Sequence, residues 1–235
     1  LVAENGKMLH QKEKNTDWST EIKERVFHSF HRVPITVEEL QLKETTGTHQ
    51  RVIDMVAHEL ITKERIEEWK ELPGVAPGVD ISRDIVKLAA IERHKNTGHV
   101  GLGFLGKYGL KKGAVATSIG HDSHNLVIAG VTDEDMVLAG NRVIENGGGL
   151  AIALEGKVLA DLPLPIGGLM ADEPGEVVDE KLEHMKKLSV ELGISEDIDA
   201  FMTLAFISLP VIPKLRLNTY GIVDVEKHQV VEARF

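Results

Sequence analysis

One short stretch of the sequence concentrates side chains that can carry protons and form hydrogen bonds. It consists of His121, Asp122, Ser123, His124 and Asn125. Two imidazoles, a carboxylate, a hydroxyl and an amide in five residues suit a site for a polar heterocycle better than an ordinary solvated loop. Imidazole and carboxylate groups can act as general acid or base, or hydrogen-bond the edge of a ring. We therefore interpret this stretch as lining of a substrate pocket.

Two other interpretations of the stretch stay open. His121 and His124 stand three positions apart, which on a helix would place both on one face as metal ligands. Asp122 would complete a set of two histidines and one carboxylate. The flanking residues are strand-like, so a turn is expected and the helical argument loses its basis. The third interpretation is a buried structural network in which Asp122 fixes a histidine tautomer, because buried polar groups need partners.

Neighbouring motifs are interpreted as supporting or structural. His94 is expected to approach the stretch, and Arg93 or Lys95 to pair with Asp122. The glycines at 101, 103 and 106 match a dinucleotide-binding fingerprint by letter, but no capped helix follows them. Such glycines in a strand indicate close backbone approach to a neighbour or a ligand. The lysines at 111 and 112 are expected in a solvated turn, and the histidines at 28 and 31 on a surface helix.

Composition narrows the function classes. The chain has 235 residues, a formal net charge of -10 and 42% hydrophobic residues. The spread of acidic residues argues against a nucleic-acid surface, which needs a basic stripe. The absence of cysteine excludes disulfides and thiolate chemistry. No apolar run approaches the length of a membrane span and no signal peptide opens the chain, so we expect a cytoplasmic protein without a membrane partner.

Hydrophobic patterning predicts an α+β fold, with a mixed β-sheet and helices packed on its faces. A helix capped by Ser19 or Thr20 is expected to stop at Pro34, and the apolar segment 202–211 is excluded from a central strand by its prolines. Residues 62–71 are expected to form an exposed helix or turn. The strands are predicted at 51–56, 84–91, 99–105, 114–119, 126–131, 150–154 and 158–162, and two further helices after Thr132 and from about Glu176 to Gly193.

The start of the chain suggests a piece of a longer protein. Residues 2–9 resemble a hairpin around Asn5-Gly6. We expect residues 1–10 to be the remnant of a small β-sandwich domain, residues 11–50 a linker and irregular segment, and residues 51–235 an α+β domain.

Several motifs, kept in order over roughly residues 80–225, resemble the C-terminal region of microbial adenine deaminases. They are residues 92–98 (ERHKNTG), 101–104 (GLGF), 113–125 (GAVATSIGHDSHN), 132–136 (TDEDM), 146–149 (NGGG), 162–170 (LPLPIGGLM), 201–204 (FMTL) and 210–213 (PVIP). Residues 1–80 resemble the family more loosely.

The resemblance implies a place in a larger enzyme of purine salvage. Family members resemble other amidohydrolases, with a metal-bearing (β/α)8 barrel, a small β-sandwich and this C-terminal domain. They hydrolyse adenine to hypoxanthine and ammonia with manganese or iron. This chain contains no His-x-His motif and no barrel pattern. We therefore expect no metal ligand, no cofactor and no assigned catalytic residue in it, and an inactive fragment.

The partners that the resemblance implies are adenine, the amidohydrolase barrel and a second copy in a homo-oligomer. An apolar face around residues 201–212 is expected to be covered by the barrel or to self-associate. The alternatives are a stand-alone purine- or metal-binding module, and a purely structural or dimerisation domain.

Overall fold

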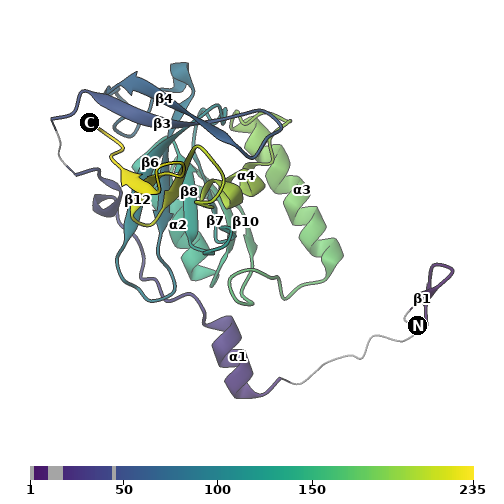
Figure 1. Cartoon of the computed structure of the whole chain (residues 1–235). Helices are drawn as coiled ribbons and strands as arrows, with labels where there is room; N and C mark the ends of the chain where they lie inside the picture. The colour runs from purple at the N-terminus through teal and green to yellow at the C-terminus, as the bar shows by residue number, and fades with distance from the viewer. Residues whose placement is uncertain (1–2, 10–17, 44–45) are drawn as a thin grey trace.

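The computed structural model describes residues 3–9, 18–43 and 46–235 and is built around one eight-stranded sheet (Figure 1). The strand order is β10-β9-β7-β8-β5-β6-β3-β4. The strands are β3 (His49–Met55), β4 (Thr62–Glu68), β5 (Ile85–Ile91), β6 (Val100–Gly106), β7 (Ala114–Thr117), β8 (Leu126–Gly130), β9 (Gly149–Leu154) and β10 (Lys157–Pro163).

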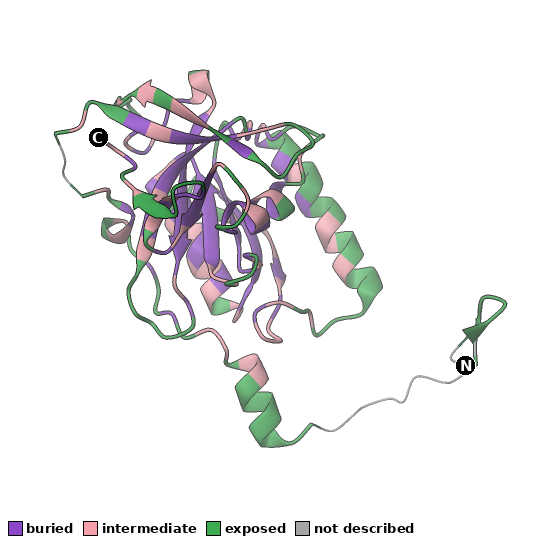
Figure 2. Cartoon of the chain, in the orientation of Figure 1, coloured by how far each residue is buried: buried purple, intermediate pink, exposed green. Residues whose placement is uncertain are grey.

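The sheet is mixed, as the sequence predicts. Neighbouring strands run antiparallel except β3 and β6, which pair in parallel. Strands β5 and β8 lie in the middle and are buried along their whole length. Their continuous apolar sequence is typical of strands covered on both faces. Figure 2 shows this buried centre.

Helix α2 (Asp133–Glu145) covers one face of the sheet. The hydroxyl oxygen of Thr132 accepts a hydrogen bond from the Asp135 N–H at 3.3 Å and caps the helix, as the sequence predicts. Its inner side chains Met136, Ala139 and Val143 are buried in one core cluster with residues of β5, β7, β8 and β9.

The opposite face is covered by α3 (Gly175–Glu191), α4 (Ala200–Ile207) and a small sheet of β11 (Leu215–Asn218), β12 (Gly221–Asp224) and β13 (Gln229–Val231). Leu204 and Ile207 of α4 share a core cluster with Val115 and Val127 of the large sheet. The sequence analysis missed α4. The sequence signal for this helix is Asp199 at its N-terminal cap. The Asp199 carboxylate accepts hydrogen bonds from the N–H groups of Phe201 and Met202 at 3.1 and 2.9 Å.

Strand β4 overturns the expectation of an exposed helix or turn at residues 62–71. It pairs antiparallel with β3 at the edge of the sheet. Ion pairs join the two strands, Arg51 with Glu64 at 2.6 Å and Arg65 with Asp54 at 2.9 Å. Cross-strand charge pairs stabilise an edge strand whose alternating charges also fit helical spacing.

The N-terminal elements agree in part with prediction. Strands β1 (Ala3–Glu4) and β2 (Lys7–Met8) form the predicted hairpin, with positive φ at Asn5 and Gly6 of 48° and 75°. Helix α1 (Thr20–Phe27) is capped by Ser19 but ends at Phe27, before Pro34. Residues 11–17 and 44–45 of the expected linker and irregular segment lie outside the described residues. Short 3-10 turns occur at η1 (Glu38–Leu40) and η2 (Ile81–Arg83).

Candidate functional site

The candidate residues 121–125 form a turn between two paired strands, which we call the polar turn. Strands β7 and β8 run antiparallel, with Thr117 opposite Val127. His121, Asp122 and Ser123 are exposed, and the two residues after them are half-buried. The sequence prediction of a turn between buried strands is confirmed. The five residues therefore lie together at one end of the central sheet.

Helix α4 holds one side of the polar turn. The N–H of His121 donates to the carbonyl oxygen of Ala205 at 2.8 Å. The His121 ring stacks on Phe206 with its centroid 5.5 Å away and 29° between the ring planes. The Ser208 hydroxyl donates to the His121 carbonyl oxygen at 3.5 Å. An element that the sequence analysis missed thus positions the first histidine.

The loop after β5 holds the other side. The predicted approach of His94 is confirmed, because its Nε2 lies 2.7 Å from the Ser123 carbonyl oxygen. Arg93 does not pair with Asp122; its Nε donates to the His124 carbonyl oxygen. Asp122 contacts the imidazole Nδ1 of His121 instead. Through its hydrogen bond to the His124 carbonyl, the buried Arg93 fixes the backbone of the turn.

Arg93 is a buried cation bound by carbonyl groups. Its Nη2 donates to the Gly167 oxygen at 3.0 Å and its Nη1 to the Ser29 oxygen at 3.5 Å. Its guanidinium carbon lies 4.9 Å from the centroid of the Phe30 ring. Burial lowers the pKa of Arg93 to about 10, so the group stays charged at neutral pH. It joins two other segments, at residues 29–30 and at residue 167, to the polar turn.

Glu92 orders the loop that carries Arg93 and His94. Its carboxylate accepts from the N–H groups of His94, Lys95 and Thr97 at 2.6, 2.9 and 2.9 Å, and from the Thr97 hydroxyl at 3.0 Å. Burial alone would raise the pKa of Glu92, but these donors outweigh it and lower that pKa to about 2. The carboxylate is therefore ionised at neutral pH, and its hydrogen bonds hold the loop in one conformation.

Two acceptors of the polar turn have no donor in the described part of the chain. They are Nδ1 of His124 and Oδ1 of Asn125, both buried. Burial, and then the charges of Arg93 and His121, lower the pKa of His124, so its ring is neutral at neutral pH and can accept a hydrogen bond. A buried acceptor without a donor costs about 1–3 kcal/mol. The turn is therefore short of N–H or O–H donors.

The pattern of the adenine deaminase C-terminal domain matches residues 59–229 of the chain. The chain belongs to this family. The match confirms the resemblance seen in the sequence motifs, and it extends from just before β4 to the first residue of β13.

Similar curated proteins are named adenine deaminase. An adenine deaminase 2 of Carboxydothermus hydrogenoformans is 43% identical over 98% of this chain and 39% of its own length. Adenine deaminases of Lysinibacillus sphaericus and Kosmotoga olearia are 39% and 43% identical over the same shares. The chain thus spans about two fifths of the length of these relatives.

The residues of this adenine deaminase C-terminal domain do not fit a metal centre. No group of three or more histidine, aspartate or glutamate side chains in the described residues is close enough to share a metal ion. Within the polar turn, the ring of His121 contacts the carboxylate of Asp122. The interpretation of His121, Asp122 and His124 as a metal-ligand set is therefore not supported by this geometry.

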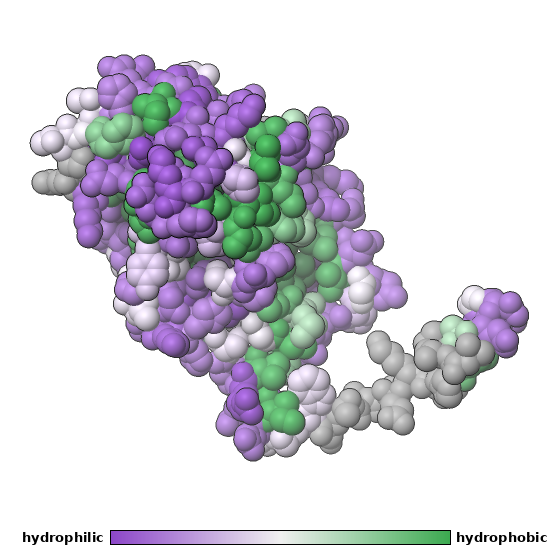
Figure 3. All heavy atoms as spheres, in the orientation of Figure 1, coloured by the Kyte–Doolittle hydropathy of each residue, from purple (hydrophilic) through white to green (hydrophobic). Residues whose placement is uncertain are grey.

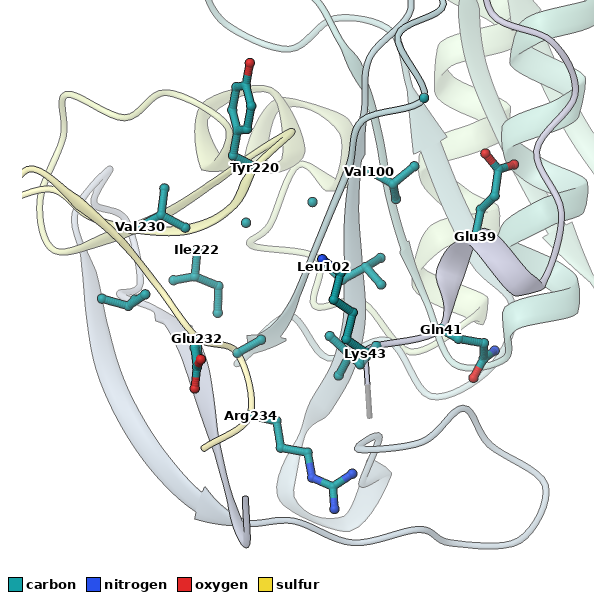
Figure 4. A pocket seen from close by; sticks show the side chains of 16 residues that line it. Glu39, Gln41, Lys43, Val100, Leu102, Tyr220, Ile222, Val230, Glu232 and Arg234 are labelled. Atoms are coloured by element: carbon teal, nitrogen blue, oxygen red, sulfur yellow. The ribbon is translucent and has the colours of Figure 1, made fainter. Parts of the chain in front are cut away.

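A separate groove of about 520 Å³ lies between the start of β6, the segment before β3 and the small sheet (Figure 4). Its labelled charged residues are Glu39, Lys43, Glu232 and Arg234. No residue of the polar turn lines it. The sequence predicts close backbone approach at Gly101. A Cβ added at this position would clash with the carbonyl oxygen of Asn218, so the close neighbour of Gly101 is the small sheet.

The glycine motif at residues 101–106 and the lysine pair at 111 and 112 both lie where the sequence predicts. The three glycines of the dinucleotide-like motif lie on β6 from end to end, which agrees with the rejection of that motif. Lys111 and Lys112 are exposed, as expected of a solvated turn. No described helix combines the length and apolar character that a membrane span requires.

Proposed function

We propose that this chain is the C-terminal part of a cytoplasmic enzyme of purine salvage that hydrolyses adenine to hypoxanthine and ammonia. The observation that carries the proposal is the family match over residues 59–229. Relatives named adenine deaminase, similar over 98% of the chain, support it. The same proposal includes the division of the chain into a β-sandwich remnant at residues 1–10, a linker and irregular segment at 11–50 and an α+β domain at 51–235.

In this proposal, the metal ion is bound by a part of the whole enzyme that lies outside this chain. Hydrolysis of an aromatic amine needs an activated water, which manganese or iron would supply in the whole enzyme. The described residues offer no shared ligand set. What this chain contributes is therefore binding, orientation and exclusion of water.

The polar turn is proposed to line the adenine pocket at the mouth of a catalytic barrel. The two unsatisfied acceptors, on His124 and Asn125, support this role. Adenine presents N–H donors at its exocyclic amino group and on its imidazole ring, and such donors would satisfy both acceptors. His121 adds an imidazole on the exposed side of the turn, where it can carry a proton toward departing ammonia.

An apolar face beside the polar turn is proposed to pack on that barrel. Leu60, Ile61 and Met202 line one depression there and are 53%, 39% and 50% exposed. Val211, after α4, is 69% exposed. Figure 3 shows apolar surface gathered over the region where Figure 1 places α4. Self-association through this face into a homo-oligomer is the alternative use of the same surface.

The test compares single substitutions in the full-length protein. We expect His121→Ala and His124→Ala to lower kcat/KM for adenine by about 10²-fold, the scale of a lost acid–base group. Metal content should stay unchanged. His184→Ala, an exposed histidine on α3, is the matched control and should keep normal kinetics. Normal kinetics with a lower Tm in both turn variants would make the polar turn purely structural.

A further inference from the structure

A small depression on the apolar face, which we call the α4 slot, has an unusual lining. It lies between the β3–β4 connection, α4 and β11, with a volume of about 170 Å³. Its apolar lining comes from Met55, Leu60, Ile61, Met202, Phe206 and Ile207. The polar residues of the lining are Arg216, Thr62, Thr203 and Glu59. The slot has room for a side chain or for a molecule of similar size.

Arg216 brings a buried positive charge to this slot. The residue is 1% exposed, and burial lowers the pKa of its guanidinium to about 10, so it is charged at neutral pH. Its Nη1 donates to the Leu215 oxygen at 3.2 Å, and its Nη2 to the oxygens of Leu60 and Pro213. Its buried Nε has no acceptor, and none of the described carboxylates forms an ion pair with it.

The other buried or partly buried arginines show what Arg216 lacks. Arg32 and Arg83 also leave one nitrogen without an acceptor, but each pairs with a carboxylate, Glu39 and Asp80 respectively. Arg93 has no carboxylate, but all three of its nitrogens donate to carbonyl oxygens. A buried charge that has neither a counterion nor a full set of hydrogen bonds is costly to keep.

We propose that the α4 slot is a binding site for a carboxylate group on a short apolar chain. A carboxylate supplies the missing countercharge and can accept two hydrogen bonds from a guanidinium. The apolar lining would hold the attached methylene groups. Two sources carry this chemistry, namely an acidic side chain of a protein region that covers the face, and a free small carboxylate. The inference does not depend on the proposed enzyme activity.

The slot is connected to the polar turn through one side chain. Phe206 lines the slot and stacks on the ring of His121. Occupation of the slot therefore fixes the side chain on which the first histidine of the turn rests. Glu59, exposed near the slot, is the acidic residue of its lining and repels a carboxylate ligand.

The probe is sodium butyrate, compared with its neutral counterpart butyramide at constant ionic strength. Methyl NMR of the chain labelled at methionine reports on the slot through Met55 and Met202. We expect butyrate to shift both signals saturably and to bind at least about tenfold more tightly than butyramide, the discrimination expected from one charge-assisted hydrogen-bond pair. Glu59→Gln should tighten butyrate binding about twofold or more by removing a like charge.

Arg216→Leu should abolish the preference for butyrate, whereas Lys112→Met, which removes an exposed charge, should keep it. Thr203→Leu fills the slot without touching Arg216 and should also abolish binding, which keeps the test valid if Arg216→Leu does not fold. Equal binding of butyrate and butyramide, or an unchanged preference in Thr203→Leu, overturns the proposal.

The full-length protein then separates the two sources. If an acidic side chain of the remaining polypeptide fills the slot, butyrate no longer shifts Met55 and Met202 there, and Arg216→Leu lowers Tm more in the full-length protein than in this chain. If a free carboxylate is the ligand, the butyrate shifts persist. Both results support the carboxylate site, and a loss of deaminase activity in either case leaves it untouched.

Discussion

Arg93 donates a hydrogen bond from Nε to the carbonyl oxygen of His124, 31 residues further along the chain. A buried cation on the loop after β5 thereby sets the backbone of the polar turn between β7 and β8. The same guanidinium holds the carbonyl of Gly167. The turn and the segment after β10 therefore share one support.

Arg93→Leu should lower the free energy of unfolding by about 3 kcal/mol, because it removes a charged donor from buried carbonyl groups. Arg93→Lys keeps the charge but not the planar fork of donors, so we expect an intermediate loss. Urea denaturation followed by the fluorescence of Trp69, which packs edge-on against Phe104, measures both. Arg25→Leu on the exposed side of α1 is the control and should change stability by less than about 0.5 kcal/mol. Equal losses at both arginines would contradict the support role.

Gly168→Ala should be markedly worse than Gly167→Ala. Both glycines have positive φ, 75° and 68°, so both alanines carry backbone strain of about 1–2 kcal/mol. A Cβ at position 168 would lie 2.7 Å from Nη1 of Arg93, whereas one at position 167 meets no atom within 4 Å. The difference in Tm between the two variants isolates the contact with the guanidinium. Identical Tm values would show that Arg93 moves freely.

Glu92→Gln should remove stability that depends on pH. The folded-state pKa of Glu92 is about 2, against 4.5 for an unperturbed glutamate, so the ionised group stabilises the fold fully above about pH 4.5. That contribution is lost as the pH falls from about 4.5 to 2. We expect the wild-type chain to lose about 1–2 kcal/mol more than Glu92→Gln over this window, after allowance for solvent screening. Parallel stability curves in urea between pH 5 and pH 2.5 would contradict the shift.

The chain of 235 residues on its own should release no ammonia from adenine, even with manganese added. The physical reason is the absence of a His-x-His motif from its sequence and of a shared ligand set among its described residues. An ammonia assay against a blank of manganese and adenine checks the expectation. Release well above that blank would place a catalytic centre in this chain.

The sequence determined the elements whose signals are local. The apolar runs of β5 and β8 predict buried central strands, and Thr132 marks the start of α2 within one residue. The ordered motifs over residues 80–225 indicate the family without reference to the fold. The crowding of polar groups at residues 121–125 likewise located the turn, because turns and caps depend on residues close in the chain.

The tertiary structure decided what depends on distant partners. The charges of residues 62–68 suit a helix or an edge strand equally, and pairing with β3 makes them a strand. The roles of Arg93 and Arg216 follow from carbonyl groups as far as 74 and 156 residues away, which no spacing rule connects. Local patterns set propensity and polarity, but the burial of a charge and the atoms that satisfy it depend on how the chain packs.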